Sequence, residues 1–368
     1  MKVLHLGSIK TGIDTYVRNT VSAASDKFEF VIVHGGDDNG NPFYRNGRLV
    51  PEHKIAMYRS LNPFKDFKAV MQAIKVIRKE KPDLIHCHSA KGGVVGRFAA
   101  FFTHTKAVYT PHAFSFLSSK SRIKSTIFLF LEKIARLKSN LLACSNTELE
   151  LGLSKVGFKK EKAFVWNNAI SDPLSENSSE VAPLEGPYII SVGRPSYQKN
   201  PLLMVEIMKE VHKVHPEMKF YMLGVGFYSP ELENMENLIA EYELEDVIKL
   251  LPYMSHEETL QHVKNSEIYL TTSLYEGLPI AVLEAMAESK PIVASDVIGN
   301  KDCVKDGYNG YLLPLDCKKF VEKINFLLDN KAEREKMANN SRIYFESDFL
   351  LKNRIADLES VYLKVVDS

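Results

Sequence analysis

The sequence has no long apolar run: nowhere do about 18 apolar residues follow one another, so no segment is expected to span a bilayer. Residues 1–7 are a short apolar stretch without the cationic start, long apolar core and small-residue cleavage site of a signal peptide. Cysteine is scarce, and the four cysteines include no C-x-x-C pair. These absences argue against secretion and favour a reducing cytosol.

Motifs for metal and dinucleotide binding are also missing. No D-x-D occurs, so the carboxylate pair that commonly holds a divalent cation on nucleotide phosphates is absent. No G-x-G-x-x-G follows the first apolar run, which argues against a dinucleotide dehydrogenase. In His86-Cys87-His88, strand alternation puts the two histidines on one face, and two ligands are too few for a closed metal site. We therefore expect neither a metal nor another cofactor.

Charge is plentiful but unevenly distributed. The 368 residues carry a net charge of +1, yet residues 1–170 contain 27 Lys and Arg against 13 Asp and Glu, which is a charge of +14. Residues 171–368 contain 20 against 33, which is −13. This asymmetry indicates that the first half meets something anionic, although two ordinary solvated surfaces would give the same counts.

Short apolar runs alternate with amphipathic segments along the whole chain, as expected for strands buried in parallel sheets. These runs lie at residues 3–6, 28–33, 84–87, 107–109, 141–143, 164–166, 188–192, 219–223, 247–250, 268–272 and 291–294. The polar stretch 171–186 is predicted to be a linker. We predict an α/β protein with Rossmann-like domains at residues 1–170 and 187–345 and a C-terminal helix at residues 346–368.

A phosphate site is predicted near the start of the second domain. Arg194 and Lys199 lie between the strand at 188–192 and a helix that opens near Pro201. The free N–H groups of a helix N-terminus attract anions, and the two side chains add full positive charges. Two solvated loop cations are the ordinary alternative. The position at the carboxyl end of a strand favours the functional interpretation.

A pair of glutamates follows a later strand. Glu276 opens the sequence Glu-Gly-Leu-Pro, and Glu284 lies in the helix that follows. A carboxylate can accept two hydroxyl hydrogen bonds from a sugar or ribose diol, and Gly277 allows the backbone to approach a phosphate closely. Glutamate near a helix start also compensates the helix dipole, so this spacing alone does not decide the function.

Taken together, these residues resemble one family. Glu276 and Glu284 in the pattern E-x7-E, with Arg194 and Lys199 in V-G-R-x4-K, are similar to the family 4 retaining glycosyltransferases of the GT-B fold. Three further segments match that family, at residues 168–170, 223–226 and 306–312. The resemblance implies two Rossmann-like domains that face each other across a cleft, with the C-terminal helix crossing back to the N-terminal domain.

The resemblance also implies roles for single residues. Arg194 and Lys199 would hold the donor diphosphate, Glu284 the ribose and Glu276 the transferred sugar, with His112 beside that sugar. Catalysis is thus expected from His112, Glu276, Arg194 and Lys199. Further donor contacts are expected at Gly12, Gly224, Gly226, Gly277 and Leu278. The first loop has Thr11-Gly12 where the family usually has two glycines.

The implied activity is transfer of a sugar from a nucleotide diphosphate sugar, with UDP as the expected nucleotide. The expected acceptor is a glycan or lipid-linked saccharide in cell-surface polysaccharide or capsule synthesis, and no nucleic acid is expected as a partner. We expect retention of configuration, independence of metals and a cytoplasmic location. A GT-B sugar epimerase, a phosphorylase and a non-catalytic nucleotide-sugar-binding subunit stay open as alternatives.

An amphipathic helix within residues 118–138 leads to a prediction about membranes. Phe128 and Leu129 are expected to point outward among basic residues, a mixture typical of a helix on anionic lipid. A loop or a neighbouring subunit is the alternative cover. We predict peripheral binding to the inner face of the plasma membrane. The opposite stripe is expected to pack against the domain and consists of Ile123, Ile127, Phe130, Leu131, Ile134 and Leu137.

Overall fold

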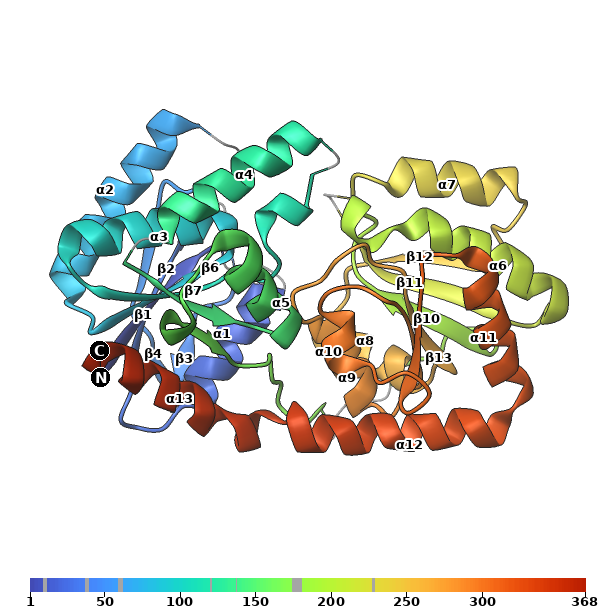
Figure 1. Ribbon diagram of the computed structural model, residues 1–368. Helices are drawn as coiled ribbons and strands as arrows, with labels where there is room; N and C mark the ends of the chain where they lie inside the picture. Colours follow the sequence, from blue (N-terminus) through green and yellow to red (C-terminus); the bar gives the residue numbers. More distant parts are fainter. Residues whose placement is uncertain are drawn as a thin grey trace. The chain divides into compact units, whose positions relative to one another are not determined.

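The computed structural model describes the chain in two compact units (Figure 1). Met1–Ala169 and Leu351–Ser368 form the N-terminal unit, and Ile170–Leu350 form the C-terminal unit. Parts of the predicted first loop and of the predicted linker lie outside the described residues. The residues described are 1–8, 12–36, 40–58, 62–119, 121–136, 138–173, 181–226 and 229–368.

A parallel sheet of seven strands forms the centre of the N-terminal unit, in the order β5-β2-β1-β6-β7-β8-β9. Its strands are β1 (Lys2–Gly7), β2 (Glu29–Gly35), β5 (Glu52–Ile55), β6 (Leu84–His88), β7 (Lys106–Thr110), β8 (Asn140–Ala143) and β9 (Ala163–Val165). A separate antiparallel pair consists of β3 (Tyr44–Arg45) and β4 (Arg48–Leu49). The sequence did not predict β5, because only Ile55 of its four residues is both apolar and buried.

Helices cover both faces of this sheet. On one face lie α2 (Pro63–Glu80), α3 (Ser89–Thr103) and α4 (Arg122–Ala135), and α5 (Asn146–Leu151) follows β8. On the other face lie α1 (Gly12–Ala23) and the C-terminal helix α13 (Leu351–Asp367). The indole nitrogen of Trp166 donates to the carbonyl of Arg354 in α13 at 2.9 Å. The predicted return of the C-terminal helix to the N-terminal domain is therefore confirmed.

The C-terminal unit contains a parallel sheet of six strands in the order β12-β11-β10-β13-β14-β15. The strands are β10 (Tyr188–Val192), β11 (Lys219–Val225), β12 (Ile248–Pro252), β13 (Ile268–Thr271), β14 (Ile292–Ser295) and β15 (Gly310–Leu313). The helices are α6 (Pro201–Val214), α7 (Leu232–Glu241), α8 (His256–Lys264), α9 (Ile280–Ala287), α10 (Asn300–Cys303), α11 (Cys317–Asp329) and α12 (Lys331–Asp348). The two units confirm the predicted two-domain α/β fold class.

The order of the strands gives each sheet a topological switch point. Successive strands are added on one side of β10 up to β12, and β13 is then added on the other side of β10. In the N-terminal sheet, the same reversal lies between β1 and β6. Open α/β sheets bind ligands at the carboxyl ends of the strands beside such a point. Functional residues are therefore expected at the carboxyl ends of β10, β13, β1 and β6.

The chain returns to the N-terminal unit at Leu351, later than the predicted residue 346. The reason is that α12 continues as one helix to Asp348 and is anchored to the C-terminal unit. Its Arg342 donates to the carboxylate of Asp172 at 2.8 Å and to the carbonyl of Ala287 at 2.9 Å. The change of unit therefore falls between α12 and α13.

The prediction for the face of α4 that packs inward was wrong. Phe128 and Leu129 pack against the apolar core, whereas most of the predicted inward stripe lies on the surface. The exposed fractions of that stripe are 75% for Ile123, 50% for Ile127, 62% for Phe130, 39% for Leu131 and 40% for Ile134. Leu137, the last member of the stripe, lies outside the described residues.

The buried carboxylate of Glu132 explains this orientation. It accepts hydrogen bonds from the Arg97 guanidinium and from the Tyr109 hydroxyl, both at 2.8 Å, and Glu132 is 2% exposed. A buried charge requires partners, and these partners lie on α3 and β7. The helix therefore turns Glu132 inward together with Phe128, which lies one turn before it. Among the described helices, none is long and apolar enough to cross a membrane.

Candidate functional site

The switch point of the C-terminal sheet gathers the residues predicted to bind a donor. Gly193 and Arg194 directly follow β10, and Lys199 lies in the turn before α6. Glu276 lies in the loop after β13, the neighbour of β10. The ammonium group of Lys199 contacts the Glu276 carboxylate, with 2.8 Å between Nζ and Oε1. Two segments far apart in the sequence are thus joined by an ion pair at the carboxyl edge of the sheet.

Glu276 is held by three side-chain donors. Its Oε1 accepts from Lys199 and from the hydroxyl of Ser273 at 2.7 Å, and its Oε2 accepts from the amide of Gln198 at 2.9 Å. The same Gln198 amide also donates to the carbonyl of Tyr275 at 3.2 Å. Glu276 is 6% exposed. Such a carboxylate is fixed in one orientation, as a group that positions a substrate requires.

The backbone around Glu276 depends on a glycine in the next loop. The Glu276 amide donates to the carbonyl of Ile298 at 3.0 Å. Gly299 follows with a φ of 82°, and a Cβ added there would lie 2.7 Å from the Cβ of Glu276 and 2.7 Å from the carbonyl oxygen of Gly277. Any larger residue would push this segment away. The loop after β14 therefore packs against the backbone of Glu276 and holds it in place.

Glu284 lies in the helix that follows the loop of Glu276. It lies in α9, which begins at Ile280 directly after the Glu-Gly-Leu-Pro segment, and it is 8% exposed. Its Oε1 lies 2.8 Å from Nε2 of His256, the first residue of α8, and the His256 side chain is 60% exposed. Gly277 and Leu278 are buried just ahead of the helix. A carboxylate and a helix N-terminus thus lie on one short segment.

The predicted glycine turns lie at the ends of the adjacent strands β10 and β11. Gly193 has a φ of 146° and Gly224 a φ of 92°, both in the left-handed region that favours glycine. The Gly193 amide donates to the carbonyl of Leu223 at 2.8 Å, so the two turns lie against each other. A Cβ at Gly226 would lie 2.1 Å from the ring of Tyr253. Arg194, half-buried, follows Gly193 at this edge.

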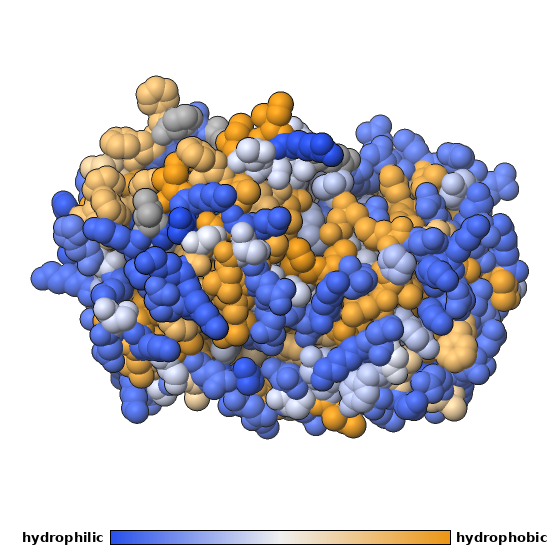
Figure 2. Space-filling view, viewed as in Figure 1, coloured by the Kyte–Doolittle hydropathy of each residue, from blue (hydrophilic) through white to orange (hydrophobic). Residues whose placement is uncertain are grey.

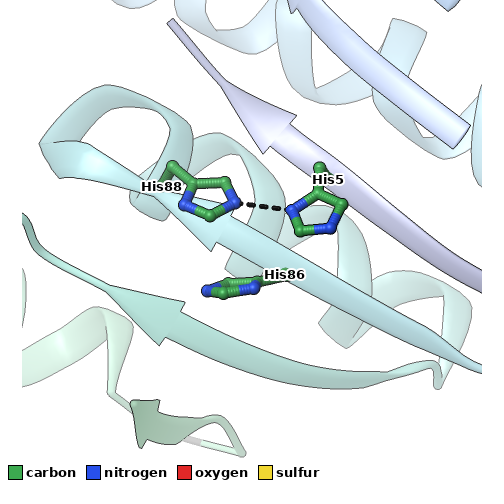
Figure 3. A group of neighbouring side chains, drawn as sticks. All are labelled: His5, His86 and His88. Carbon is green, nitrogen blue, oxygen red and sulfur yellow. Dashed lines mark hydrogen bonds between the residues drawn. The ribbon is translucent and has the colours of Figure 1, made fainter. Parts of the chain in front are cut away.

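The switch point of the N-terminal unit contains four histidines. His5 comes from β1, and His86 and His88 come from β6, where His86 is paired in register with His5. All three are fully buried. Figure 3 shows the three rings side by side, with a dashed line between His5 and His88. Nδ1 of His5 lies 2.8 Å from Nε2 of His88, and Nδ1 of His88 lies 3.0 Å from Nε2 of His112. The three imidazoles of His5, His88 and His112 thus form a hydrogen-bonded chain.

Burial keeps these imidazoles neutral. Desolvation lowers the pKa of His5 and that of His112 to about 3. The pKa values of His86 and His88 also fall well below the usual value, chiefly through desolvation and further through the neighbouring imidazoles. Each ring therefore carries a single N–H at neutral pH.

The sequence suggested only His86 and His88 as possible metal ligands. A third histidine, His5, lies beside them because it comes from the neighbouring strand β1. Ring nitrogens of His5, His86 and His88 lie within 4.8 Å of one another. Five of their six ring nitrogens, however, already have hydrogen-bond partners, since His86 contacts Tyr362 at 2.7 Å and Thr110 at 2.8 Å. The rings of His86 and His88 pack face to face at a tilt of 33°, with centroids 4.0 Å apart. This geometry favours a hydrogen-bond network over metal coordination.

His112 lies in a strained turn after β7. His112 has a φ of 51° and Ala113 a φ of 81°, values that non-glycine residues adopt at a cost. The Ala113 amide donates to Oε1 of Glu148 at 2.7 Å, and the Cys144 amide donates to Oε2 of the same carboxylate at 2.8 Å. Glu148 is 1% exposed. Its buried carboxylate therefore fixes the turn that presents His112.

The structure thus groups Arg194, Lys199, Glu276 and Glu284 with the predicted glycines in the C-terminal unit. His112 and Gly12, the first residue of α1, belong to the N-terminal unit. The sequence reasoning missed several supporting residues. For Gln198 and Ser273 the available signal was a further polar residue inside a matched segment, and for Glu148 it was a Ser-x-x-Glu helix start. The missed residues are Gln198, Ser273, His256, Gly299, Glu148, His5 and His88.

Two family models match the chain. The model for "Glycosyltransferase Family 4" matches residues 10–172, and the model for "Glycosyl transferases group 1" matches residues 175–344. A UDP-Gal:alpha-D-GlcNAc-diphosphoundecaprenol alpha-1,3-galactosyltransferase of Escherichia coli is 26% identical over 84% of this chain and 82% of its own. The capsular polysaccharide biosynthesis glycosyltransferase CapM of Staphylococcus aureus is 25% identical over 84% of each chain.

Solved structures share the fold. A sucrose-phosphate synthase from Thermosynechococcus elongatus superposes with a TM-score of 0.85 over 100% of this chain and 99% of its own, at 18% identity. Anabaena HepE in complex with UDP and glucose superposes with a TM-score of 0.76 over 98% of this chain and 99% of its own, at 17% identity. At such identities the likeness shows the fold alone.

Proposed function

Because this chain belongs to the family 4 glycosyltransferases, we propose that it is a retaining, metal-independent enzyme that transfers a sugar from a UDP-sugar to a lipid-linked saccharide. The observation that supports this most strongly is the ion pair of Lys199 and Glu276 at the switch point between β10 and β13. UDP is supported by the UDP-Gal donor in the name of the Escherichia coli relative. The lipid-linked acceptor is supported by the diphosphoundecaprenol in the same name.

The diphosphate is proposed to bind beside Arg194 and Lys199. Both follow β10, and Lys199 is separated only by Asn200 from Pro201, the first residue of α6. The N-terminus of α6 adds a partial positive charge to the two full charges. Lys199 is 21% exposed while it pairs with Glu276, so its ammonium group has room for a second anionic partner. Cations supplied by the protein make a divalent metal unnecessary in this proposal.

The sugar and the ribose are proposed to bind the two glutamates. Lys199 and Ser273 donate to one oxygen of Glu276, and Gln198 donates to the other. A carboxylate oxygen accepts about two hydrogen bonds, so Oε2 of Glu276 keeps acceptor capacity for a sugar hydroxyl. Glu284 is oriented by His256 and would accept from the ribose. Both carboxylates position the donor and supply no nucleophile.

The proposed transfer forms one bond and breaks one bond at the anomeric carbon. The bond to the diphosphate oxygen breaks, and that oxygen keeps the electron pair, while Arg194, Lys199 and the N-terminus of α6 stabilise its charge. The acceptor hydroxyl oxygen bonds to the same face of the anomeric carbon. Its proton passes to the leaving phosphate oxygen, so no side chain acts as a general base. The product keeps the configuration of the donor.

A lipid-linked acceptor lies in a membrane, so the enzyme must reach the membrane surface. We propose that α2 and α4 bind to anionic lipid there. Phe64 and Phe67 of α2 are 88% and 68% exposed, and Ile123 and Phe130 of α4 are exposed as well. Figure 2 shows apolar side chains gathered over these helices. Basic side chains lie among them, and each adds about 1 kcal/mol near an anionic surface. The exposed basic residues include Lys65, Lys68, Lys75, Arg78 and Lys124.

Vesicle co-sedimentation tests this docking. The wild type is expected to bind vesicles that contain phosphatidylglycerol at low salt and to dissociate at high salt, because surface charge attraction is screened. The variant Ile123→Ser with Phe130→Ser should bind more weakly. Ile343→Ser is the matched control, since Ile343 is 56% exposed on α12 of the other unit. Absent wild-type binding at low salt, or equal binding of all three proteins, would contradict the proposal.

A panel of nucleotide sugars tests the reaction itself. The released nucleotide is measured with and without a lipid-linked saccharide acceptor and without added phosphate. Release of UDP that depends on the acceptor supports a glycosyltransferase. Release without an acceptor would favour an epimerase, a requirement for inorganic phosphate would favour a phosphorylase, and binding without turnover would favour a non-catalytic subunit.

A further inference from the structure

The hydrogen bonds that link the imidazoles of His5, His88 and His112 all run in one direction. The buried ring of His5 determines which direction this is. Nδ1 of His5 faces His88, and Nε2 of His5 is buried without a hydrogen-bond partner among the described residues. A neutral imidazole carries one proton on one of its two nitrogens. A proton on Nε2 would leave a buried N–H donor unpaired, which native structures avoid more strongly than an unpaired acceptor. The proton of His5 therefore sits on Nδ1.

This choice fixes the next two rings in turn. Nδ1–H of His5 donates to Nε2 of His88 across 2.8 Å, so His88 carries its proton on Nδ1. Nδ1–H of His88 then donates to Nε2 of His112 across 3.0 Å, so His112 also carries its proton on Nδ1. Among the described residues, Nδ1 of His112 has no hydrogen-bond partner within the protein. It is left to donate outward.

His86 lies against this chain but belongs to a separate network. The hydroxyl of Thr110 donates to the carbonyl of Leu142 at 2.7 Å, so Thr110 can only accept from Nε2–H of His86. Nδ1 of His86 then accepts from the hydroxyl of Tyr362. His86 thus ties α13 to the sheet and leaves the direction of the His5 chain unchanged.

We propose that His5 and His88 are positioning residues that hold His112 as its Nδ1–H tautomer, so that His112 donates a hydrogen bond to a hydroxyl oxygen of the transferred sugar. This inference rests on the proposed function. Nε2 of His112 is occupied by the bond from His88, so neutral His112 offers the substrate no lone pair and cannot act as a general base. The chain also ends at a buried nitrogen, so protons cannot leave through it. The fixed turn at Ala113 and Glu148 keeps this donor in place.

Nitrogen NMR of the full chain with nitrogen-15 in the histidine rings reports the tautomer of each ring. This measurement does not depend on whether the protein is enzymatically active. His5, His88 and His112 are expected to show a protonated Nδ1 and a bare Nε2, with no change from pH 8 to pH 6. Signals are assigned by single His→Asn substitutions. A protonated Nε2 on His112, or titration of its ring in this range, would overturn the proposal. If the wild type turns over no nucleotide sugar, the proposed function fails while this result is unaffected.

A matched pair of variants tests the direction of the chain. In His5→Asn the side-chain amide still donates to His88, so turnover is expected within about threefold of the wild type. In His5→Asp, which has nearly the same shape, the carboxylate accepts only and reverses the chain, so that His112 loses its outward donor. Turnover should then fall about tenfold or more, with a changed pH profile. Equal turnover of folded His5→Asn and His5→Asp would contradict the proposal. If either variant fails to fold, the NMR result for the wild type decides the question instead.

Discussion

Replacing Glu276 by glutamine removes one charge and keeps the shape. The amide oxygen can take the place of Oε1 and still accept from Lys199 and Ser273. The new NH2 group then faces the NH2 group of Gln198. The Gln198 amide must therefore rotate by half a turn to accept this hydrogen bond, and it loses its 3.2 Å hydrogen bond to the carbonyl of Tyr275. Because Lys199 is partly exposed, solvent compensates part of the lost ion pair. We expect a loss of about 1–2 kcal/mol in the free energy of unfolding.

The expected effect on turnover is larger. A charge-assisted hydrogen bond to a sugar hydroxyl contributes about 1.5–3 kcal/mol, so kcat should fall about 10- to 150-fold. UDP affinity should change little, because the carboxylate is assigned to the sugar. The assays are denaturant unfolding, released-nucleotide kinetics and UDP titration calorimetry. Glu288→Gln is the matched control, since Glu288 is also buried in the C-terminal unit and has no proposed donor contact. Wild-type kcat in Glu276→Gln, or UDP affinity reduced as much as kcat, would refute this reasoning.

Three other predictions concern the diphosphate contact, the role of metals and the buried histidines. Arg194→Ala should weaken both UDP binding and turnover, each by about 1.5–3 kcal/mol, and calorimetry with unchanged UDP affinity would oppose the diphosphate assignment. Excess EDTA should leave most activity intact, and activity restored only by magnesium or manganese would contradict this. Acid should destabilise the N-terminal unit: the pKa of His5 and His112 is about 3 when folded against 6.5 when unfolded, so the unfolded state binds more protons between these values. Stability is then lost as pH falls below 6.5, by about 1.4 kcal/mol per pH unit for each histidine. Circular dichroism of denaturant unfolding at several pH values should show a shallower slope for His5→Asn.

The apolar strand pattern predicted the fold class because strands buried on both faces need continuous apolar runs. Tyr188–Val192 and Ile268–Thr271, the two strands that flank the switch point, both lie in runs of this kind. Strand β5 lacks such a run and was missed. The donor-site motifs follow these strands directly, so sequence position was enough to place Arg194, Lys199 and Glu276 at one edge.

Contacts between distant segments could not be read from spacing. The orientation of α4 depends on Glu132 meeting Arg97 and Tyr109, and the sequence around Glu132 reveals neither partner. The helix α4 has apolar residues on two faces, and the buried charge of Glu132 determines which of the two faces packs inward. The histidine chain depends in the same way on β1 lying beside β6, which brings His5 to His88. Periodicity predicts the elements, but tertiary partners decide which face is buried.

The anomeric configuration of the product tests the central claim most directly. The full chain is incubated with the UDP-sugar that it turns over and with a lipid-linked saccharide acceptor, and the new linkage is analysed by proton NMR. In the proposed mechanism UDP leaves and the acceptor attacks on one face of the sugar. An α-linked donor should therefore give an α-linked product, with one UDP released for each bond formed. A β-linked product would contradict the account.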